Sequence, residues 1–154
     1  MGAIYRITED FYEDSFELLA LHSTLEDYAL VYRLNLYLNA KFERTEKDLG
    51  TAAEVNFPLF EWRDDTRDLY WTLICNCTSA VDMTTGDGLF GNNPTFVTYH
   101  FIPEQKEVDY FLKIEQGEMD YGKDVVAILN TIPNIITAYP LETQTLKSKK
   151  NLIF

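Results

Sequence analysis

Two cysteines and two histidines are the side chains of this sequence best suited to bind a metal or to attack a substrate. Cys75 and Cys77 flank Asn76 in a segment with strand character, where alternate residues point to the same face. A structural zinc ion needs about four ligands, and His22 and His100 are the only further soft candidates. We therefore expect two buried, reduced thiols; a metal site and a redox pair are the alternatives.

The two histidines give little support for acid–base catalysis. His22 precedes Ser23 at an expected strand-to-helix junction, where a surface or helix-start role is the simpler explanation. His100 alternates between Tyr99 and Phe101 in an expected strand, which is typical of a packed, hydrogen-bonded side chain. Paired carboxylates are too common in so acidic a chain to mark a site. The sequence predicts no catalytic residue, metal site or cofactor, and it favours a non-enzymatic role without excluding an enzyme.

A glycine-rich segment matches a nucleotide-binding pattern by its letters alone. Gly86–Gly91 spells GxGxxG, but Asn92, Asn93 and Pro94 follow it directly. The dinucleotide fingerprint must open a helix, and these turn-forming residues do not allow one. We therefore expect a loop here.

Strands and helices must position these residues, and their order predicts the fold class. The expected elements are a strand at 16–21, a helix at 25–38, an edge strand at 41–49, a hairpin of 57–62 with 69–78, a loop at 79–94, a hairpin of 96–102 with 108–115, a helix at 123–132 and a strand at 135–139. This order predicts one α+β domain over residues 1–154, with a mostly antiparallel sheet and two helices on one face. Residues 146–154 form a basic, then apolar, C-terminal tail.

The first expected helix is apolar around nearly its whole circumference. Ser23-Thr24-Leu25-Glu26 has the spacing of a capping box, which predicts that the helix starts there. Tyrosines and leucines between residues 25 and 38 do not keep to one stripe. Such a helix is either buried on most sides within the monomer or contacts a second molecule in an oligomer.

The charge of the chain is strongly negative and uneven. The sequence has 25 Asp and Glu against 13 Lys and Arg, a net charge of −12. Lys147, Lys149 and Lys150 all lie in the tail, so residues 1–142 carry ten basic against 25 acidic side chains, a net −15. Because nucleic-acid binding depends on clustered cations, no direct nucleic-acid contact is expected from the body of the protein. The charge favours solubility or attraction to a basic protein surface.

Nothing in the sequence directs the protein to a membrane or out of the cell. The first ten residues contain Glu9 and Asp10 and no apolar run of signal-peptide length, and no stretch approaches 18 continuous apolar residues. We therefore expect a cytoplasmic protein with no membrane contact. The glycosylation sequon at Asn76 would then be irrelevant.

The second expected hairpin carries a family resemblance. Its motif residues are Ile102, Pro103, Glu104, Val108, Asp109 and Tyr110. They resemble the signature of the IPExxVDY family, small bacterial proteins of the Bacteroidetes; the family name spells two residues between the two halves, whereas this chain has three. The similarity extends to the strand-to-helix opening and the lysine-rich end. The resemblance implies no function, because none is assigned to the family.

The motif residues themselves are typical of a folding device. Pro103 suits the second position of a turn, and Val108 and Tyr110 would face the core, on one apolar side of a strand. Glu104 and Asp109 could accept hydrogen bonds from turn amides. The alternative is that these two carboxylates bind a basic partner.

Three functional hypotheses follow from the sequence. The favoured one is a protein-interaction module, a homodimer whose acidic surface binds a basic protein. The second is a small-molecule-binding protein or enzyme with a pocket under the 79–94 loop, near His100 and Asp109. The third is an accessory factor in RNA metabolism that touches RNA through Lys147, Lys149 and Lys150.

Overall fold

The computed structural model describes residues 16–50, 55–82, 95–116 and 122–152. Ten strands lie in these ranges: β1 (Glu17–Ser23), β2 (Glu43–Arg44), β3 (Leu49–Gly50), β4 (Asn56–Phe57), β5 (Leu59–Asp64), β6 (Leu69–Cys75), β7 (Cys77–Asp82), β8 (Thr95–His100), β9 (Tyr110–Gln116) and β10 (Ile135–Leu141). The helices are α2 (Asp27–Leu38) and α3 (Gly122–Leu129), with 3₁₀ turns η1 (Pro103–Gln105), η2 (Thr143–Thr145) and η3 (Lys149–Leu152).

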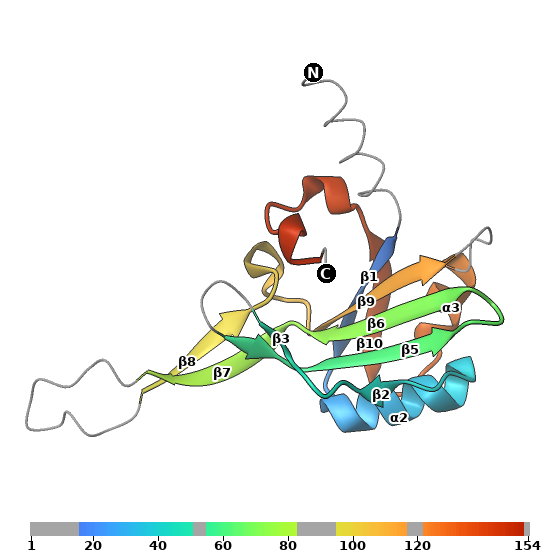
Figure 1. The fold of residues 1–154 in the computed structure, drawn as a ribbon, viewed down its shortest axis with the longest axis horizontal. Helices are drawn as coiled ribbons and strands as arrows, with labels where there is room; N and C mark the ends of the chain where they lie inside the picture. The colour runs from blue at the N-terminus through green and yellow to red at the C-terminus, as the bar shows by residue number, and fades with distance from the viewer. Residues whose placement is uncertain (1–15, 51–54, 83–94, 117–121, 153–154) are drawn as a thin grey trace, which may run out of the picture.

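Six strands form one antiparallel sheet in the order β10-β1-β9-β6-β5-β2. Two short two-stranded sheets, β3-β4 and β7-β8, accompany it. Figure 1 shows the β7-β8 ribbon projecting from the body of the molecule, while α2 and the C-terminal turns lie on opposite sides of the view. The predicted α+β fold with a mostly antiparallel sheet is therefore confirmed.

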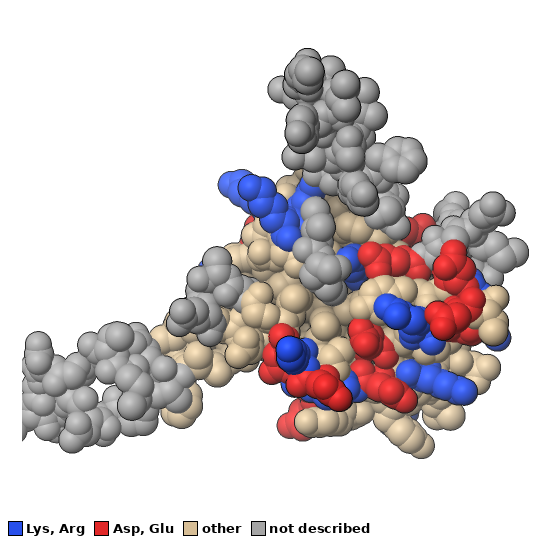
Figure 2. Space-filling model, viewed as in Figure 1, with Lys and Arg blue, Asp and Glu red and all other residues tan. Residues whose placement is uncertain are grey.

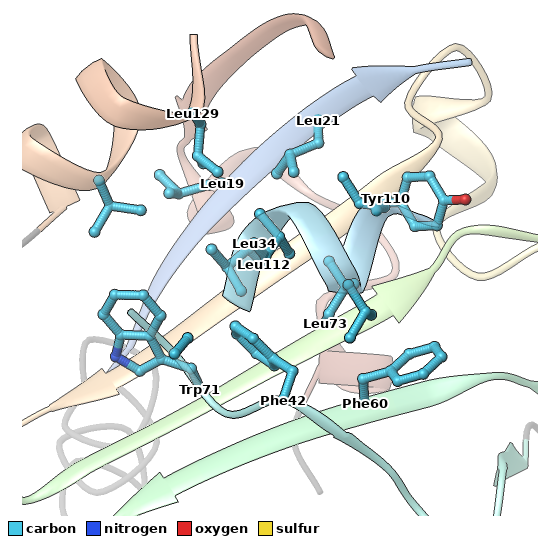
Figure 3. Packing of buried hydrophobic residues seen from close by; sticks show 14 of the residues in the cluster. Leu19, Leu21, Leu34, Phe42, Phe60, Trp71, Leu73, Tyr110, Leu112 and Leu129 are labelled. Carbon is cyan, nitrogen blue, oxygen red and sulfur yellow. The ribbon is translucent and has the colours of Figure 1, made fainter. Parts of the chain in front are cut away.

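Both helices pack on the same face of the six-stranded sheet. Leu30 and Leu34 of α2 and Leu129 of α3 are fully buried in one apolar cluster with Leu19 and Leu112 of the central strands. Figure 3 shows Leu19, Leu34, Leu112 and Leu129 in this cluster together with Phe42, Phe60 and Trp71. Their burial is the main stabilising term for the two helices, because helices of 12 and 8 residues are marginally stable in water by themselves.

The opposite face of the sheet is also covered. Leu18, Ala20, Ile74 and Phe111 point to this second face and pack against segments outside the sheet. The packing segments contribute Val55, Phe57, Phe101, Ile102, Val108, Leu146 and Leu152. Tyr110, Leu112 and Ile114 of β9 share one apolar side, as the alternation predicted, whereas Val108 precedes the strand and packs in the cluster on the opposite face; Phe111 and Lys113, on the other side of β9, are buried as well.

The predicted second hairpin is wrong in its pairing. β8 pairs with β7, and β9 lies between β1 and β6. The sequence suggested a hairpin because two strand-like runs flank a five-residue turn; the turn instead carries the chain from the ribbon back into the sheet.

The predicted strand 69–78 and loop 79–94 also need correction. Asn76 interrupts the strand, so β6 ends at Cys75 in the main sheet and β7 begins at Cys77 in the ribbon. Residues 79–82 belong to β7 rather than to a loop. Residues 83–94, which include the GxGxxG segment, lie outside the described residues.

The predicted capping box does not form. Helix α2 begins at Asp27, with Glu26 as its N-cap. Ser23 is instead the last residue of β1: its hydroxyl donates to the carbonyl of Asn134 at 2.8 Å and accepts from the amide of Leu25 at 3.1 Å. A tertiary partner therefore holds the side chain that local spacing assigned to the cap.

The described residues contain no helix with the length and apolar character needed to span a membrane.

Candidate interaction surface

The outward face of α2 carries an unusual set of side chains for a surface helix. With 100° per residue, Leu30, Val31 and Leu34 cover the sheet-facing arc, where they are buried. The outward arc is formed by Tyr28, Ala29, Tyr32, Arg33 and Leu36, which we call the α2 face. The helix is thus apolar on both sides, as the sequence predicted, but only one side is covered by the monomer.

Exposure along the α2 face is high for large apolar side chains. Tyr28 is 70% exposed, Tyr32 67% and Leu36 64%. Tyr28, Tyr32 and Leu36 are spaced four residues apart and so form one continuous stripe. Tyr and Arg are enriched among the residues that dominate protein interfaces. This stripe is therefore the candidate interaction surface of the described residues.

The base of the stripe is held by the sheet. The ring of Tyr28 meets the buried ring of Phe60 edge to face, with centroids 6.2 Å apart. The guanidinium of Arg44 lies 5.5 Å from the centroid of the same Phe60 ring. Tyr28 is consequently positioned before any partner binds, which lowers the entropy cost of an interface there.

The motif residues converge on the buried side chain of Asn76. Its amide nitrogen donates to the carbonyls of Gln105 (2.9 Å) and Val108 (2.8 Å), and its amide oxygen accepts from the backbone N–H of Ile102 (2.8 Å). Its own backbone donates to Asp109 and accepts from Phe101. Asn76 is fully buried. The sequon asparagine is thus the centre of the motif turn, a role that the sequence alone did not suggest.

Each polar motif residue binds a distant part of the chain. Oδ2 of Asp109 accepts from the amide of Ser23 at 2.9 Å, and the hydroxyl of Tyr110 donates to the carbonyl of Leu25 at 2.7 Å. Oε1 and Oε2 of Glu104 accept from the amide and hydroxyl of Ser148 at 2.7 and 2.8 Å. These contacts agree with the structural interpretation of the motif, with tertiary partners in place of the expected turn amides.

These surroundings shift the pKa values of Glu104 and Tyr110. Partial burial alone would raise the pKa of Glu104, but hydrogen bonds from the Ser148 amide and hydroxyl hold that pKa below its ordinary value. Burial, with a smaller contribution from the neighbouring Cys75, raises the pKa of Tyr110. Tyr110 therefore stays a neutral hydrogen-bond donor, and Figure 3 shows its hydroxyl pointing away from the apolar cluster.

The cysteines do not share an environment, contrary to the prediction. Cys75 is buried and Cys77 is exposed, because the break at Asn76 separates the two strands. Burial, with a smaller repulsion from Asp27, raises the pKa of the Cys75 thiol to about 12. Since the thiolate is the reactive form, Cys75 is a poor nucleophile at neutral pH.

The two histidines lie in different sheets, and His100 is the one that has a cysteine opposite it. Nε2 of His22 is 2.9 Å from the hydroxyl of Tyr139, and the two rings stack. His100 is half-buried in β8, opposite Cys77 of β7. No group of three or more His, Cys, Asp or Glu side chains in the described ranges could hold a metal ion.

A cleft of about 340 Å³ lies beside Asp109 and the cysteines. Its lining includes Glu26, Asp27, Cys75, Cys77 and Asp109. The carboxylates surround a protonated thiol, and His100 is not among the described residues that line the cleft. The predicted pairing of His100 with Asp109 in one pocket is therefore not observed among these residues.

The tail lysines sit on an ordered end of the chain. Leu146 and Leu152 are buried in the second apolar cluster, and Asn151 donates to the carbonyl of Phe101 at 2.9 Å. Lys147 and Lys150 are exposed, whereas Lys149 is half-buried. The apolar half of the tail thus packs on its own monomer through residue 152.

Charges on the described surface are mixed. The described ranges contain 17 Asp and Glu and 12 Lys and Arg, a net −5 out of the −12 of the whole chain. Figure 2 shows acidic and basic side chains interleaved over the body, with the projecting ribbon almost free of both. A continuous acidic face is therefore not the dominant feature of this view.

No protein-family model matches this chain, and the curated proteins include no match.

Proposed function

We propose that this protein is a non-enzymatic interaction module that pairs with a second copy of itself through the α2 face. The observation that carries the proposal is the exposure of Tyr28, Tyr32 and Leu36 along one stripe of the helix. Tyrosine contributes a large apolar area with few rotatable bonds, so such a stripe can be covered at low entropy cost.

The spacing of the stripe supports packing of a helix against a helix. Residues four apart form ridges, and ridges of this kind from two helices interdigitate at a crossing angle of about −50°. In a two-fold arrangement the central residue, Tyr32, lies at the crossing point. Tyr28 of one copy then packs near Leu36 of the other, which makes the stripe complementary to itself.

Charge supports a second copy as the partner. The α2 face carries Arg33 and no carboxylate, although the chain as a whole has a net charge of −12. Two acidic molecules repel each other least where they meet through a surface without acidic side chains. Charged residues are also depleted from the cores of interfaces.

The edges of the main sheet offer a weaker route to pairing. On β10, the side-chain amide of Asn130 binds both the N–H and the carbonyl of Ala138 at 3.0 Å, and Pro140 has no N–H to donate. At the other edge, β2 is only two residues long. Capped, proline-containing or very short edges resist strand addition.

The proposal extends to the location, the family and a basic protein partner. We place the protein in the cytoplasm, as a member of the IPExxVDY family, where the acidic side chains outside the α2 face attract a basic protein. In this proposal Glu104 and Asp109 stabilise the fold rather than contact the partner, because each already accepts tertiary hydrogen bonds.

Sedimentation equilibrium of the full chain and two variants tests the proposal. Tyr32→Glu should raise the dimer dissociation constant at least thirtyfold, because a central interface tyrosine typically contributes about 2 kcal/mol or more. Ile136→Glu is the matched control, since Ile136 is 70% exposed on β10 and is not part of the α2 face. A monomeric wild type, or equal dimerisation of both variants, would contradict the proposal.

A further inference from the structure

A second feature, a cleft of about 660 Å³, lies where β1 begins and β10 ends. It shares no lining residue with the α2 face. Its volume falls in the range of sites that bind small molecules, which is roughly 300–1,000 Å³. At the roughly 30 Å³ that one water occupies in the liquid, the cleft has room for on the order of twenty non-hydrogen atoms.

The interior of the cleft is apolar and its inner surface is rigid. Leu18 and Leu19 line it from the packed strand β1, where each is 1% exposed and the two side chains point to opposite faces of the sheet. Phe16, Val126 and Leu141 add half-buried apolar side chains from three separate segments. Such a lining favours an aliphatic or aromatic body.

The Phe16 side chain, which forms one wall of the cleft, is held by a cation–π contact. The ammonium of the buried Lys113 lies 4.8 Å from the centroid of the Phe16 ring and 3.2 Å from Oε1 of Glu115. A cation over its ring orients Phe16, so this wall is positioned in advance of binding. Preorganisation of this kind raises affinity for a ligand that fits.

Polar residues line the remainder of the cleft, and the charged ones among them are acidic. They are Glu17, Glu142, Thr143 and Gln144. Glu17 and Glu142 are exposed, and no Lys, Arg or His is among the described lining residues. From this lining we infer that the cleft binds an amphiphilic amine, with its apolar body against Phe16, Val126 and Leu141 and its ammonium beside the exposed Glu142 carboxylate. A carboxylate head group would meet like charge there.

Isothermal titration of the full chain with dodecylamine and with dodecanoate, both below their micellar concentrations, tests the inference. Dodecylamine should bind saturably at one per chain and at least tenfold more tightly than dodecanoate. The absence of saturable binding, or equal affinity for the two probes, would overturn the inference. Tyr32→Glu should bind dodecylamine like wild type, so failure of the α2 proposal and failure of this one can be told apart.

Two variants locate the binding. Val126→Trp fills the cleft and should weaken dodecylamine at least tenfold, whereas Ile136→Trp, a control on an exposed β10 position, should leave it unchanged. Glu142→Lys should weaken dodecylamine by about three- to tenfold, as expected for reversing one exposed charge, and strengthen dodecanoate. Because Glu142 is exposed, this variant decides the question even where Val126→Trp fails to fold. Unchanged affinities in Glu142→Lys would overturn the assignment of the head-group site.

Discussion

Asn76 is the side chain on which the turn between β8 and β9 most depends. Three hydrogen bonds from one buried amide satisfy backbone groups of Ile102, Gln105 and Val108 that water cannot reach easily. An unsatisfied buried backbone group costs about 1–3 kcal/mol. The consequence is that one residue of β6–β7 fixes the geometry of a segment about 30 residues away.

Replacing Asn76 should therefore be severe. Asn76→Ala is expected to lower the free energy of unfolding by about 3 kcal/mol or more, because three backbone groups lose their partner at once. Urea denaturation monitored by tryptophan fluorescence measures the loss. Asn56→Ala, at an exposed position in β4, should cost less than about 0.5 kcal/mol. Similar losses in the two variants would contradict the role given to Asn76.

Glu104 makes the attachment of the C-terminal segment depend on pH. Its carboxyl pKa is lowered in the folded protein from an ordinary value of 4.5, so its stabilising contribution is present above that value and is lost as pH falls through the lowered pKa. The stability difference between wild type and Glu104→Gln should thus be constant near neutral pH and shrink below about pH 4.5. Urea titrations at several pH values measure this difference; one that grows on acidification would count against the contact with Ser148.

The sequence indicates the motif residues but not Asn76, the side chain on which they converge. Val108 and Tyr110 are both buried, as the alternation of apolar residues predicts, but not on one side of a strand: β9 begins only at Tyr110, and Val108 belongs to the cluster on the opposite face. Asn76 carried no such signal, since its partners lie about 30 residues away and only the three-dimensional turn brings them together. The same reason explains Ser23, whose spacing predicted a helix cap while Asn134 holds its hydroxyl.

At the scale of elements, the C-terminal segment behaves as part of the fold. Leu152 is fully buried against the second face of the sheet, so Leu152→Ala should lower the free energy of unfolding by about 2–5 kcal/mol. Lys150→Ala, at an exposed neighbouring position, should change it by less than about 0.5 kcal/mol. Chemical denaturation of both variants tests this, and a neutral Leu152→Ala would mean that the segment is not packed in solution.

The β7-β8 ribbon is the element with the least support. Two strands alone are marginally stable in water, and Phe96 on this ribbon is 71% exposed. Backbone amides of β7 and β8 should therefore exchange with deuterium faster than those of β6 and β9, which are paired on both sides. Hydrogen-exchange mass spectrometry compares the four strands directly. Equal protection would show that the ribbon is covered in solution.

Element types were more predictable than their pairing. Strand and helix positions follow from local apolar patterns, and most of the expected segments are present close to their predicted bounds. Strand pairing depends on long-range packing. The sequence therefore predicted a hairpin of 96–102 with 108–115, whereas β8 pairs with β7. The break at Asn76 was missed because the apolar strand character continues through it.

At the scale of the whole molecule, α2 has an apolar surface that the monomer does not cover. The sequence left burial or oligomerisation open for the helix at 25–38, and the monomer covers only the arc of Leu30, Val31 and Leu34. The partner could not be predicted from composition, since the α2 face is distinguished by which residues the sheet leaves uncovered. We propose that this uncovered arc, rather than a broad acidic face, is where the protein first makes contact.

Disulfide cross-linking at the helix crossing point tests that claim most directly. Two helices packed 8–10 Å apart place facing Cα atoms roughly 5 Å apart at the crossing, within the range of a disulfide. In a Cys77→Ser background, which removes the exposed native thiol, Tyr32→Cys should form a covalent dimer under mild oxidation. Ile136→Cys, equally exposed on β10, should remain monomeric. Failure of Tyr32→Cys to cross-link, or cross-linking of both variants to the same extent, would contradict self-association through the α2 face.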